Sequence, residues 1–463
     1  MDEKTFLRQA KTKYGIARGI PCSNPAYTVF KGIPYAKPPI GALRWKPPAE
    51  PDNWDGARYC DTFSAMAMQG TPKPGDFYYH EFYSPEVSPL PRHMDEDCLY
   101  LNVWTPRAGR LQARAAAEGS DQGTVGSDQP LPVMMWVHGG AFVAGFGHEA
   151  EFDGEAFCKR GVILVTINYR LGLYGFYCHP ALSARCPYHV SGNYGLLDMM
   201  QALRWIRDNI SAFGGDPNNV TLFGQSAGGA AVQALASSPL SAGLFHKAIV
   251  QSAGLNKEKY TLAEAEQFGA ELSEGMGKSL DEILSMPAQA LSDAAAKAFG
   301  PIYDRTKKWN WYRPNVDGHV LTETTEESIL SGRHVNIPYM VGNVAGDGKG
   351  SPDKSPIQSQ QAWGDTHISL NRIPVFCYHF NHDIPGDDHP GAFHSSELWY
   401  IFNTLGRSVR PMGQIDYAIS SLMTDYWTNF AKTGDPNGDG LPKWPAYTKG
   451  QPYVHTIGKE AVS

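Results

Sequence analysis

The pentapeptide GQSAG at residues 224–228 combines residue types that could carry out nucleophilic chemistry. The apolar run TLF precedes it and the alanine-rich run GAAVQALA follows it, which predicts a strand, a sharp turn and a helix. A serine on such a turn is forced outward, while Gly224 and Gly228 remove Cβ atoms that would collide in the bend, and the helix N-terminus favours developing negative charge. We therefore predict that Ser226 is a nucleophile; the alternative is an ordinary glycine-rich turn.

A second candidate, HGGAF at residues 138–142, follows the apolar run VMMWV. Consecutive backbone amides without side chains could donate hydrogen bonds to the oxyanion of a tetrahedral intermediate. We predict an oxyanion hole made by the N–H groups of Gly139, Gly140 and Ala227. We interpret His138 as structural, because the glycines after it would supply the donors. A glycine-rich loop could also bind phosphate, but the chain has neither GxxxxGK[ST] nor GxGxxG after a strand, which argues against nucleotide binding.

These groups need a rigid sheet to position them, and several apolar runs predict one. LPVMMWV at 131–137 and GVILVTI at 161–167 are typical of strands buried on both faces of a parallel sheet, and IPYMVGN and RIPVFCYHF are later examples. Residues 193–210 carry apolar side chains at three- and four-residue steps, which predicts an amphipathic helix. The Pro- and Gly-rich first 60 residues favour short antiparallel strands. The sequence predicts an α/β fold with a large, mostly parallel central sheet flanked by helices and a small N-terminal antiparallel β segment.

The chain is interpreted as one catalytic domain over residues 1–463, because no linker rich in Gly or Ser divides it. The segment at 107–130 has a small, polar, turn-forming second half, so we expect a flexible surface insertion between two strands.

Composition and charge argue against several classes of partner. The chain has 40 basic and 47 acidic residues, a net charge of −7, which disfavours nucleic acid and anionic membranes as partners. The N-terminus lacks a basic-then-apolar leader, and no apolar run reaches about 18 residues. Seven cysteines without a CxxC pair disfavour a zinc site and cannot all pair within the chain. We expect mostly reduced thiols and a cytoplasmic location.

Seven stretches together resemble the type-B carboxylesterase family, which includes the cholinesterases. They are FKGIPYAKPPIGALRWKPP (30–48), EDCLYLNVWTP (96–106), VHGGAFVAG (137–145), NYRLGLYGF (168–176), GNYGLLD (192–198), FGGDPNNVTLFGQSAGG (213–229) and FHSSELWYIF (393–402). The resemblance spans nearly the whole chain. It implies the α/β-hydrolase fold, a triad in the chain order serine, acid, histidine, no metal or cofactor, and cleavage of carboxylic esters.

Carried over by position, the resemblance supplies the other two members of the triad. His394 in GAFHSSEL would accept the proton of Ser226 and return it to the leaving alcohol. Asp347 in GNVAGDG falls where the family usually has a glutamate, and would orient the imidazole; the alternative is a surface turn aspartate. Glu397 and Glu96 also match family positions, but we interpret them as parts of structural polar networks.

The chain departs from the family's pattern in two places. Only 47 residues separate Asp347 from His394, which predicts a shortened lid around residues 349–375. Cys98 lacks the upstream partner that many secreted relatives have, although Cys60 lies nearby and could substitute. The neighbouring histidines resemble metal ligands, but we interpret their Pro- and Gly-containing loop as a solvated turn; they are His379, His382 and His389.

The predicted function is hydrolysis of small or medium carboxylic esters through an acyl-enzyme. Aryl, feruloyl-like or polyester substrates would use the same residues. The competing interpretations are a non-enzymatic binding member of the same fold and an enzyme impaired by its short lid or altered acid. A shortened wall could also leave the site open to bulky substrates.

Overall fold

The computed structural model describes residues 8–84, 87, 93–106, 129–255, 258, 260–308, 311–347 and 356–461. Nearly all of the insertion expected at 107–130 lies outside the described residues, as do residues 349–355 of the expected lid region.

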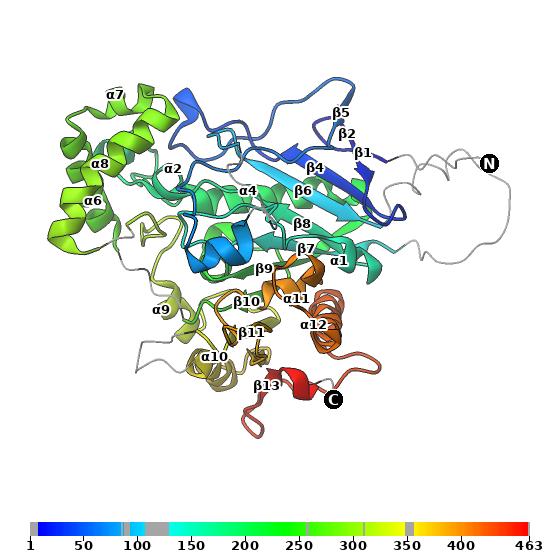
Figure 1. The fold of residues 1–463 in the computed structure, drawn as a ribbon. Helices are drawn as coiled ribbons and strands as arrows, with labels where there is room; N and C mark the ends of the chain where they lie inside the picture. Colours follow the sequence, from blue (N-terminus) through cyan, green and yellow to red (C-terminus); the bar gives the residue numbers. More distant parts are fainter. Residues whose placement is uncertain are drawn as a thin grey trace.

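A large central sheet organises the molecule (Figure 1). Its strands are β3 (Ile20–Pro21), β4 (Thr28–Pro34), β6 (Tyr100–Thr105), β7 (Leu131–Val137), β8 (Ile163–Ile167), β9 (Gly215–Gln225), β10 (Lys247–Gln251), β11 (Tyr339–Val344), β12 (Phe376–Phe380) and β13 (Val454–Ile457). Their order is β13-β12-β11-β10-β9-β7-β8-β6-β4-β3. Neighbours from β13 to β8 are parallel, and the pairs from β8 to β3 are antiparallel. The predicted mostly parallel sheet is confirmed.

A second, smaller sheet lies at the N-terminal end of the chain. It joins β1 (Gln9–Lys11), β2 (Ile16–Arg18) and β5 (Ala57–Tyr59). The pair β1–β2 is antiparallel, as predicted for this segment, whereas β2 and β5 pair in parallel.

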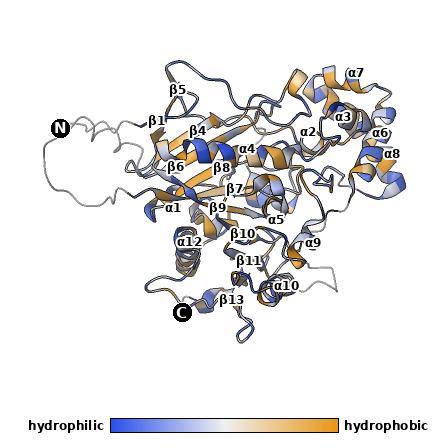
Figure 2. Cartoon of the chain, turned by 180° about the vertical axis from the view of Figure 1, so that it is seen from behind, coloured by the Kyte–Doolittle hydropathy of each residue, from blue (hydrophilic) through white to orange (hydrophobic). Residues whose placement is uncertain are grey.

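Helices cover both faces of the central sheet. They are α1 (Glu155–Lys159), α2 (Gly172–Phe176), α3 (Pro180–Arg185), α4 (Tyr194–Asn209), α5 (Ala227–Ser237), α6 (Leu262–Met276), α7 (Leu280–Ser285), α8 (Ala288–Thr306), α9 (Thr325–Leu330), α10 (Pro356–Ser369), α11 (Leu398–Ile401) and α12 (Gln414–Thr433). The helix predicted after residue 193 is α4. Hydrophobic residues gather along the central strands (Figure 2).

Alternation along the strands divides the interior into two cores. In β7, Met135 points to a first core shared with α4, α5 and α10, and Trp136 points to a second core shared with α1, α11 and α12. The same period of two continues in β9, where Leu222 belongs to the first core and Phe223 to the second. The parallel strands are therefore apolar on both sides, which is why they read as uninterrupted apolar runs.

Helices α6, α7 and α8 pack on one another beside the sheet, in the upper left of Figure 1. The sequence specifies where they begin. Thr261 accepts a hydrogen bond from the N–H of Glu264, whose carboxylate accepts the N–H of Thr261, and this capping box starts α6. Ser279 and Glu282 repeat the arrangement at α7.

The described part of the expected lid region forms α10, which connects β11 to β12. Its Trp363 is buried in the first core, with its ring 4.9 Å from that of Tyr339 in β11. These residues therefore act as a crossover helix on the sheet, and an abbreviated lid stays a prediction.

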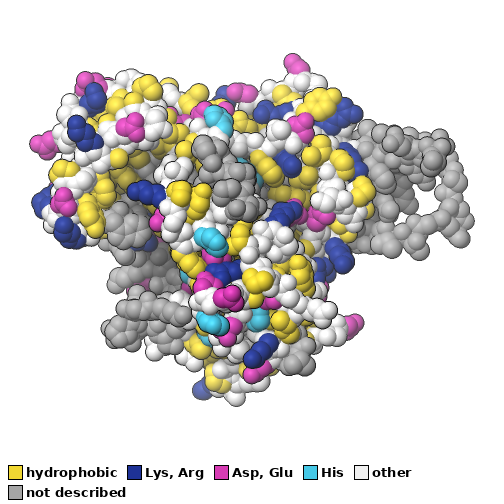
Figure 3. Space-filling view, viewed as in Figure 1, with side chains coloured by type: hydrophobic (Ala, Val, Ile, Leu, Met, Phe, Trp, Pro, Cys, Tyr) yellow, Lys and Arg dark blue, Asp and Glu magenta, His cyan; other side chains and the backbone are white. Residues whose placement is uncertain are grey.

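Three further features bear on the composition-based expectations. All seven cysteines are free thiols, including Cys60 and Cys98. No helix within the described ranges is long and apolar enough to cross a bilayer. Acidic and basic side chains are interspersed over the face shown in Figure 3.

A buried ion pair fixes the loop after β8 to α4. Both carboxylate oxygens of Asp198 accept hydrogen bonds from the guanidinium of Arg170, at 2.8 and 2.6 Å. The two side chains are 3% and 0% exposed, for arginine and aspartate respectively. Removing one partner of such a pair leaves an uncompensated buried charge.

We predict that Asp198→Ala lowers the free energy of unfolding by about 3–5 kcal/mol, because Arg170 keeps its buried charge without a partner. Urea unfolding followed by tryptophan fluorescence measures the change. Asp52→Ala, which breaks the exposed pair of Asp52 with Lys37, is the control and should leave the midpoint unchanged. Equal midpoints for the two variants would contradict the prediction.

Candidate active site

The backbone at Ser226 makes the sharp turn that the motif predicts. Strand β9 ends at Gln225, α5 begins at Ala227, and Ser226 lies between them with φ 57° and ψ −123°. Its N–H donates to the carbonyl of Gln251 on β10 at 2.9 Å, and its carbonyl accepts the N–H of Ala230. Few non-glycine residues adopt this conformation, so the neighbouring strand and helix hold the serine at the carboxyl end of the sheet.

The two glycines of the motif are steric requirements. A Cβ atom on Gly228 would lie 2.1 Å from the carbonyl oxygen of Val137, at the end of β7. A Cβ atom on Gly224 would lie 2.6 Å from the carbonyl carbon of Gly228. Any larger residue would push α5 away from the sheet, as the sequence argument proposed.

The predicted acid and histidine lie in contact. Nδ1 of His394 is 2.6 Å from Oδ1 of Asp347, and the other carboxylate oxygen accepts the N–H of Val344 at 3.1 Å. The two loops approach so closely that the N–H of Gly346 donates to the carbonyl of Ala392 at 2.7 Å. A Cβ atom on Gly346 would lie 2.4 Å from that carbonyl oxygen. The glycine before the aspartate therefore permits the contact.

Ser226 and His394 line one cavity of about 340 Å³. Nε2 of the imidazole lies 3.3 Å from the amide nitrogen of Gln225, and within the described part of the chain no hydrogen bond joins it to Oγ of Ser226. Hydrogen bonds between a nucleophile and its base commonly tighten only when substrate is bound. The structure thus brings both groups into one cavity but does not join them.

The predicted oxyanion donors surround the serine. A Cβ atom on Gly139 would lie 3.2 Å from Cβ of Ser226, so this loop touches the nucleophile. Among the residues described, no acceptor takes the N–H of Gly139 or Gly140. Ala227 is the first residue of α5, and an N–H at that position has no acceptor within its own helix. Both glycines line the cavity, whereas Ala227 is buried beside Ser226.

The loop that carries these N–H groups has strained backbone angles, and a side chain from another loop holds it in place. Gly140, Ala141 and Phe142 have φ values of 95°, 56° and 65°. The amide of Gln69 bonds twice to the backbone of Gly145, accepting from its N–H at 2.8 Å and donating to its carbonyl at 2.9 Å. Sequence reasoning missed Gln69, because a single polar residue in a loop gives no signal.

His138 has the structural role that we expected. Its ring stacks on Tyr169 with centroids 4.4 Å apart, and Nδ1 lies 2.9 Å from the carbonyl of Gly139. Burial lowers the pKa of His138 to about 4, so the ring is neutral at pH 7.

Buried carboxyl groups set the electrostatics of His394. Burial lowers the pKa of this histidine, but the hydrogen bond and charge of Asp347 raise it further, so the pKa lies above its ordinary value. Burial and the charge of Asp347 raise the pKa of Glu397 to about 8. Glu397 is therefore mostly protonated at pH 7, and its Oε1 accepts a long hydrogen bond of 3.4 Å from Ser252.

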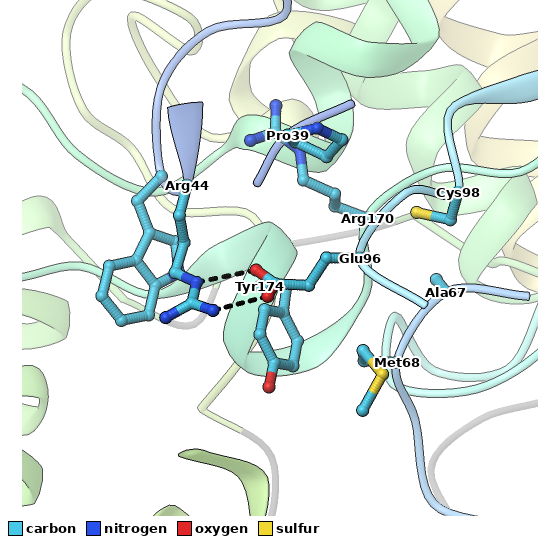
Figure 4. Close-up of a pocket in the computed structure, with 9 residues that line it drawn as sticks. Pro39, Arg44, Ala67, Met68, Glu96, Cys98, Arg170 and Tyr174 are labelled. Carbon is cyan, nitrogen blue, oxygen red and sulfur yellow. Dashed lines mark hydrogen bonds and ion pairs between the residues drawn. The ribbon is translucent and has the colours of Figure 1, made fainter. Parts of the chain in front are cut away.

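Glu96 lies in a different pocket. Its carboxylate pairs with the guanidinium of Arg44, with Nε 2.7 Å from Oε1, beside Tyr174 and Arg170 (Figure 4). It joins the residues around Arg44 and does not line the cavity at Ser226.

The neighbouring histidines have separate partners. Nδ1 of His379 lies 2.8 Å from the side-chain oxygen of Asn343, and Nε2 of His382 lies 2.8 Å from Asp416. His389 is exposed. In the part of the chain that the structure describes, no group of three His, Cys, Asp or Glu side chains is arranged to hold a metal.

The chain is similar in sequence and in structure to several known proteins. The sequence profile of the carboxylesterase family matches residues 8–361 and 356–463. A fumonisin B1 esterase of Sphingopyxis macrogoltabida is 33% identical over 92% of this chain and 82% of its own length. The cocaine esterase of Homo sapiens is 32% identical, over 95% and 85% of the two chains. A solved thermophilic PNB esterase superposes with a TM-score of 0.78 at 29% identity, covering 98% of this chain and 96% of that one.

We predict that the acid limb of kcat/KM for p-nitrophenyl acetate lies above about pH 6.5, the ordinary pKa of histidine. A base must be neutral to accept a proton, so a raised pKa of His394 makes activity disappear at a higher pH as the pH falls.

Asp347→Asn should lower the rate by about 10⁴-fold. It should also move the acid limb to lower pH, because burial then lowers the pKa unopposed by that carboxylate. An acid limb at the same pH in Asp347→Asn and the wild type would contradict the contact between Asp347 and His394.

Proposed function

This chain belongs to the carboxylesterase family, and from that membership we propose that Ser226, Asp347 and His394 are the residues with which it hydrolyses carboxylic esters. The family and its relatives establish a serine carboxylesterase acting on small-molecule esters, which favours an enzyme over a non-enzymatic binding member of the fold. One observation carries the residue roles: the imidazole bonded to Asp347 at 2.6 Å lines the cavity that Ser226 also lines.

In the acylation half-reaction, Oγ of Ser226 attacks the acyl carbon while Nε2 of His394 takes its proton. Asp347 holds Nδ1–H and stabilises the imidazolium. The carbonyl oxygen becomes an oxyanion that accepts hydrogen bonds from Gly139, Gly140 and Ala227, each typically contributing about 2.7–4 kcal/mol. The intermediate then expels the alcohol, which receives the proton from His394.

Deacylation repeats these steps with water. His394 takes a proton from the water as its oxygen attacks the acyl carbon of the acyl-enzyme. The same N–H groups hold the second oxyanion. When the bond to Oγ breaks, Ser226 regains a proton from the imidazolium and the carboxylic acid leaves.

The cavity supports small or medium esters with apolar parts. Aromatic side chains line it, and its volume of about 340 Å³ is in the range of small-molecule sites. The rings include those of Tyr78, Phe82, Tyr83, Phe146 and Phe152. The relatives are named as esterases of fumonisin B1, cocaine and para-nitrobenzyl esters, so the family does not fix one alcohol.

We predict that Ser226→Ala lowers hydrolysis of p-nitrophenyl acetate and butyrate by about 10⁴-fold or more, because the acyl-enzyme can no longer form. Initial rates at saturating ester measure the loss, and circular dichroism checks folding. The matched control is Ser285→Ala, since this serine is exposed and bonds only within its own helix turn. A folded Ser226→Ala variant with more than a few per cent of the wild-type rate would exclude the assignment.

We also predict that kcat/KM for p-nitrophenyl esters varies by no more than about tenfold as the acyl chain lengthens from acetate to decanoate. A pocket that discriminates between single methylene groups would produce a larger variation over this series. The short connection from Asp347 to His394 motivates this expectation, and its helix α10 packs in the first core. A collapse of activity beyond butyrate would show that other elements close the site.

A further inference from the structure

A short run of aromatic residues contacts both the cavity at Ser226 and the loop that carries His394. We call residues 77–83 the aromatic segment, and its second part is a π-helix, Tyr79–Tyr83. Such π-helical turns are rare and occur frequently at functional sites. Three rings of the segment line the cavity, and they belong to Tyr78, Phe82 and Tyr83.

The aromatic segment packs on the histidine loop at two neighbouring residues. The ring of Phe77 meets that of Phe393 edge to face, with centroids 4.9 Å apart and planes at 89°. The hydroxyl of Tyr78 donates a hydrogen bond of 3.3 Å to the carbonyl oxygen of His394. Edge-to-face rings attract each other, so both contacts hold the main chain of the loop against the segment.

A buried ion pair anchors the segment to the same loop. The side chain of Glu81 is 1% exposed, and its Oε2 accepts a hydrogen bond of 3.0 Å from Nε of Arg410. Nη2 of this guanidinium also donates to Oδ2 of Asp388 at 3.0 Å, and Asp388 lies six residues before His394. One guanidinium therefore joins the aromatic segment to the histidine loop.

The position of this loop matters because it sets the reach of the imidazole. Nδ1 of His394 is bound to Asp347, and Nε2 lies 3.3 Å from the amide nitrogen of Gln225. A general base works within about 2.6–3.2 Å of the atom that it deprotonates. A misplacement of about 1 Å can lower a rate by about 10²-fold. Contacts that fix the main chain of His394 therefore act on proton transfer from Ser226.

We propose that Phe77 and Tyr78 are positioning residues for His394, which hold its main chain where the imidazole can reach Ser226. This inference rests on the proposed function, because it concerns the base of that reaction. Tyr78 acts in two ways: its hydroxyl holds the carbonyl of His394, and its ring forms part of the wall that the ester contacts. The residue is 43% exposed, so a bound ester can cover the ring.

The two roles of Tyr78 affect different kinetic parameters. His394 is the base in both acylation and deacylation, so a displaced imidazole slows both steps and lowers kcat with little change in KM. A smaller wall weakens the binding of the ester and raises KM. The hydroxyl contacts the main chain and not the imidazole, so its removal should leave the acid limb of the pH profile in place.

The test compares Tyr78→Phe and Tyr78→Ala with the wild type in the hydrolysis of p-nitrophenyl butyrate. Tyr78→Phe keeps the ring and loses only the hydroxyl. We expect its kcat to fall about tenfold and its KM to stay within about twofold, with the acid limb at the wild-type pH. Tyr78→Ala also loses the ring and should raise KM about fivefold or more in addition.

The matched control is Tyr417→Phe, which removes a hydroxyl from a tyrosine on α12 that is 47% exposed and should keep both parameters. A kcat of Tyr78→Phe equal to that of the wild type, or a fall in kcat together with a moved acid limb, overturns the positioning role. Should Tyr78→Phe fail to fold, Phe77→Leu takes its place, since it removes the ring contact with Phe393 and should lower kcat in the same way. Absence of hydrolysis by the folded wild type would instead overturn the proposed function, so the two failures are distinguishable.

Discussion

The close approach of α5 to β7 is the contact on which the rest of the site depends. Gly228 lies so near the carbonyl of Val137 that only a residue without Cβ fits there. Val137 is also the last residue before the loop with Gly139 and Gly140. This contact therefore bears on the positions of both the proposed nucleophile and the proposed oxyanion donors. The sheet and Gln69 maintain the unusual backbone angles at Ser226 and Ala141.

Near this contact, buried carboxyl groups influence which side chains of the site are charged. Asp347 has its two oxygens occupied by His394 and a backbone N–H. Burial and the charge of Asp347 raise the pKa of Glu397 to about 8. Glu397 is thus mostly neutral at pH 7, which leaves the contact with Asp347 as the one that raises the pKa of the imidazole.

The sequence determined some parts of this arrangement locally and left others undetermined. The strand, turn and helix at Ser226 are encoded within a dozen residues, so the motif sufficed. Asp347 and His394 are 47 residues apart and follow different strands, so composition could not pair them and the family resemblance located them.

The remaining functional residues could not be predicted for a related reason. Gln69 acts through Gly145, which is distant from it in the chain, and no periodicity marks it. The parallel pairing of β2 with β5 is likewise a contact across about 40 residues that short-strand patterns do not reveal.

The division of the interior into two cores makes the proposed triad sensitive to how the two cores are placed relative to each other. Ser226 is fixed through α5, which packs in the first core, whereas the loops of Asp347 and His394 are anchored by Val344, Ala392 and Leu398 in the second. The proton transfer proposed between Ser226 and His394 would therefore join residues that are held by different hydrophobic layers. Turnover would then depend on the relative position of the two layers. A displacement of either layer that is too small to unfold any helix would abolish activity and leave the circular dichroism spectrum unchanged.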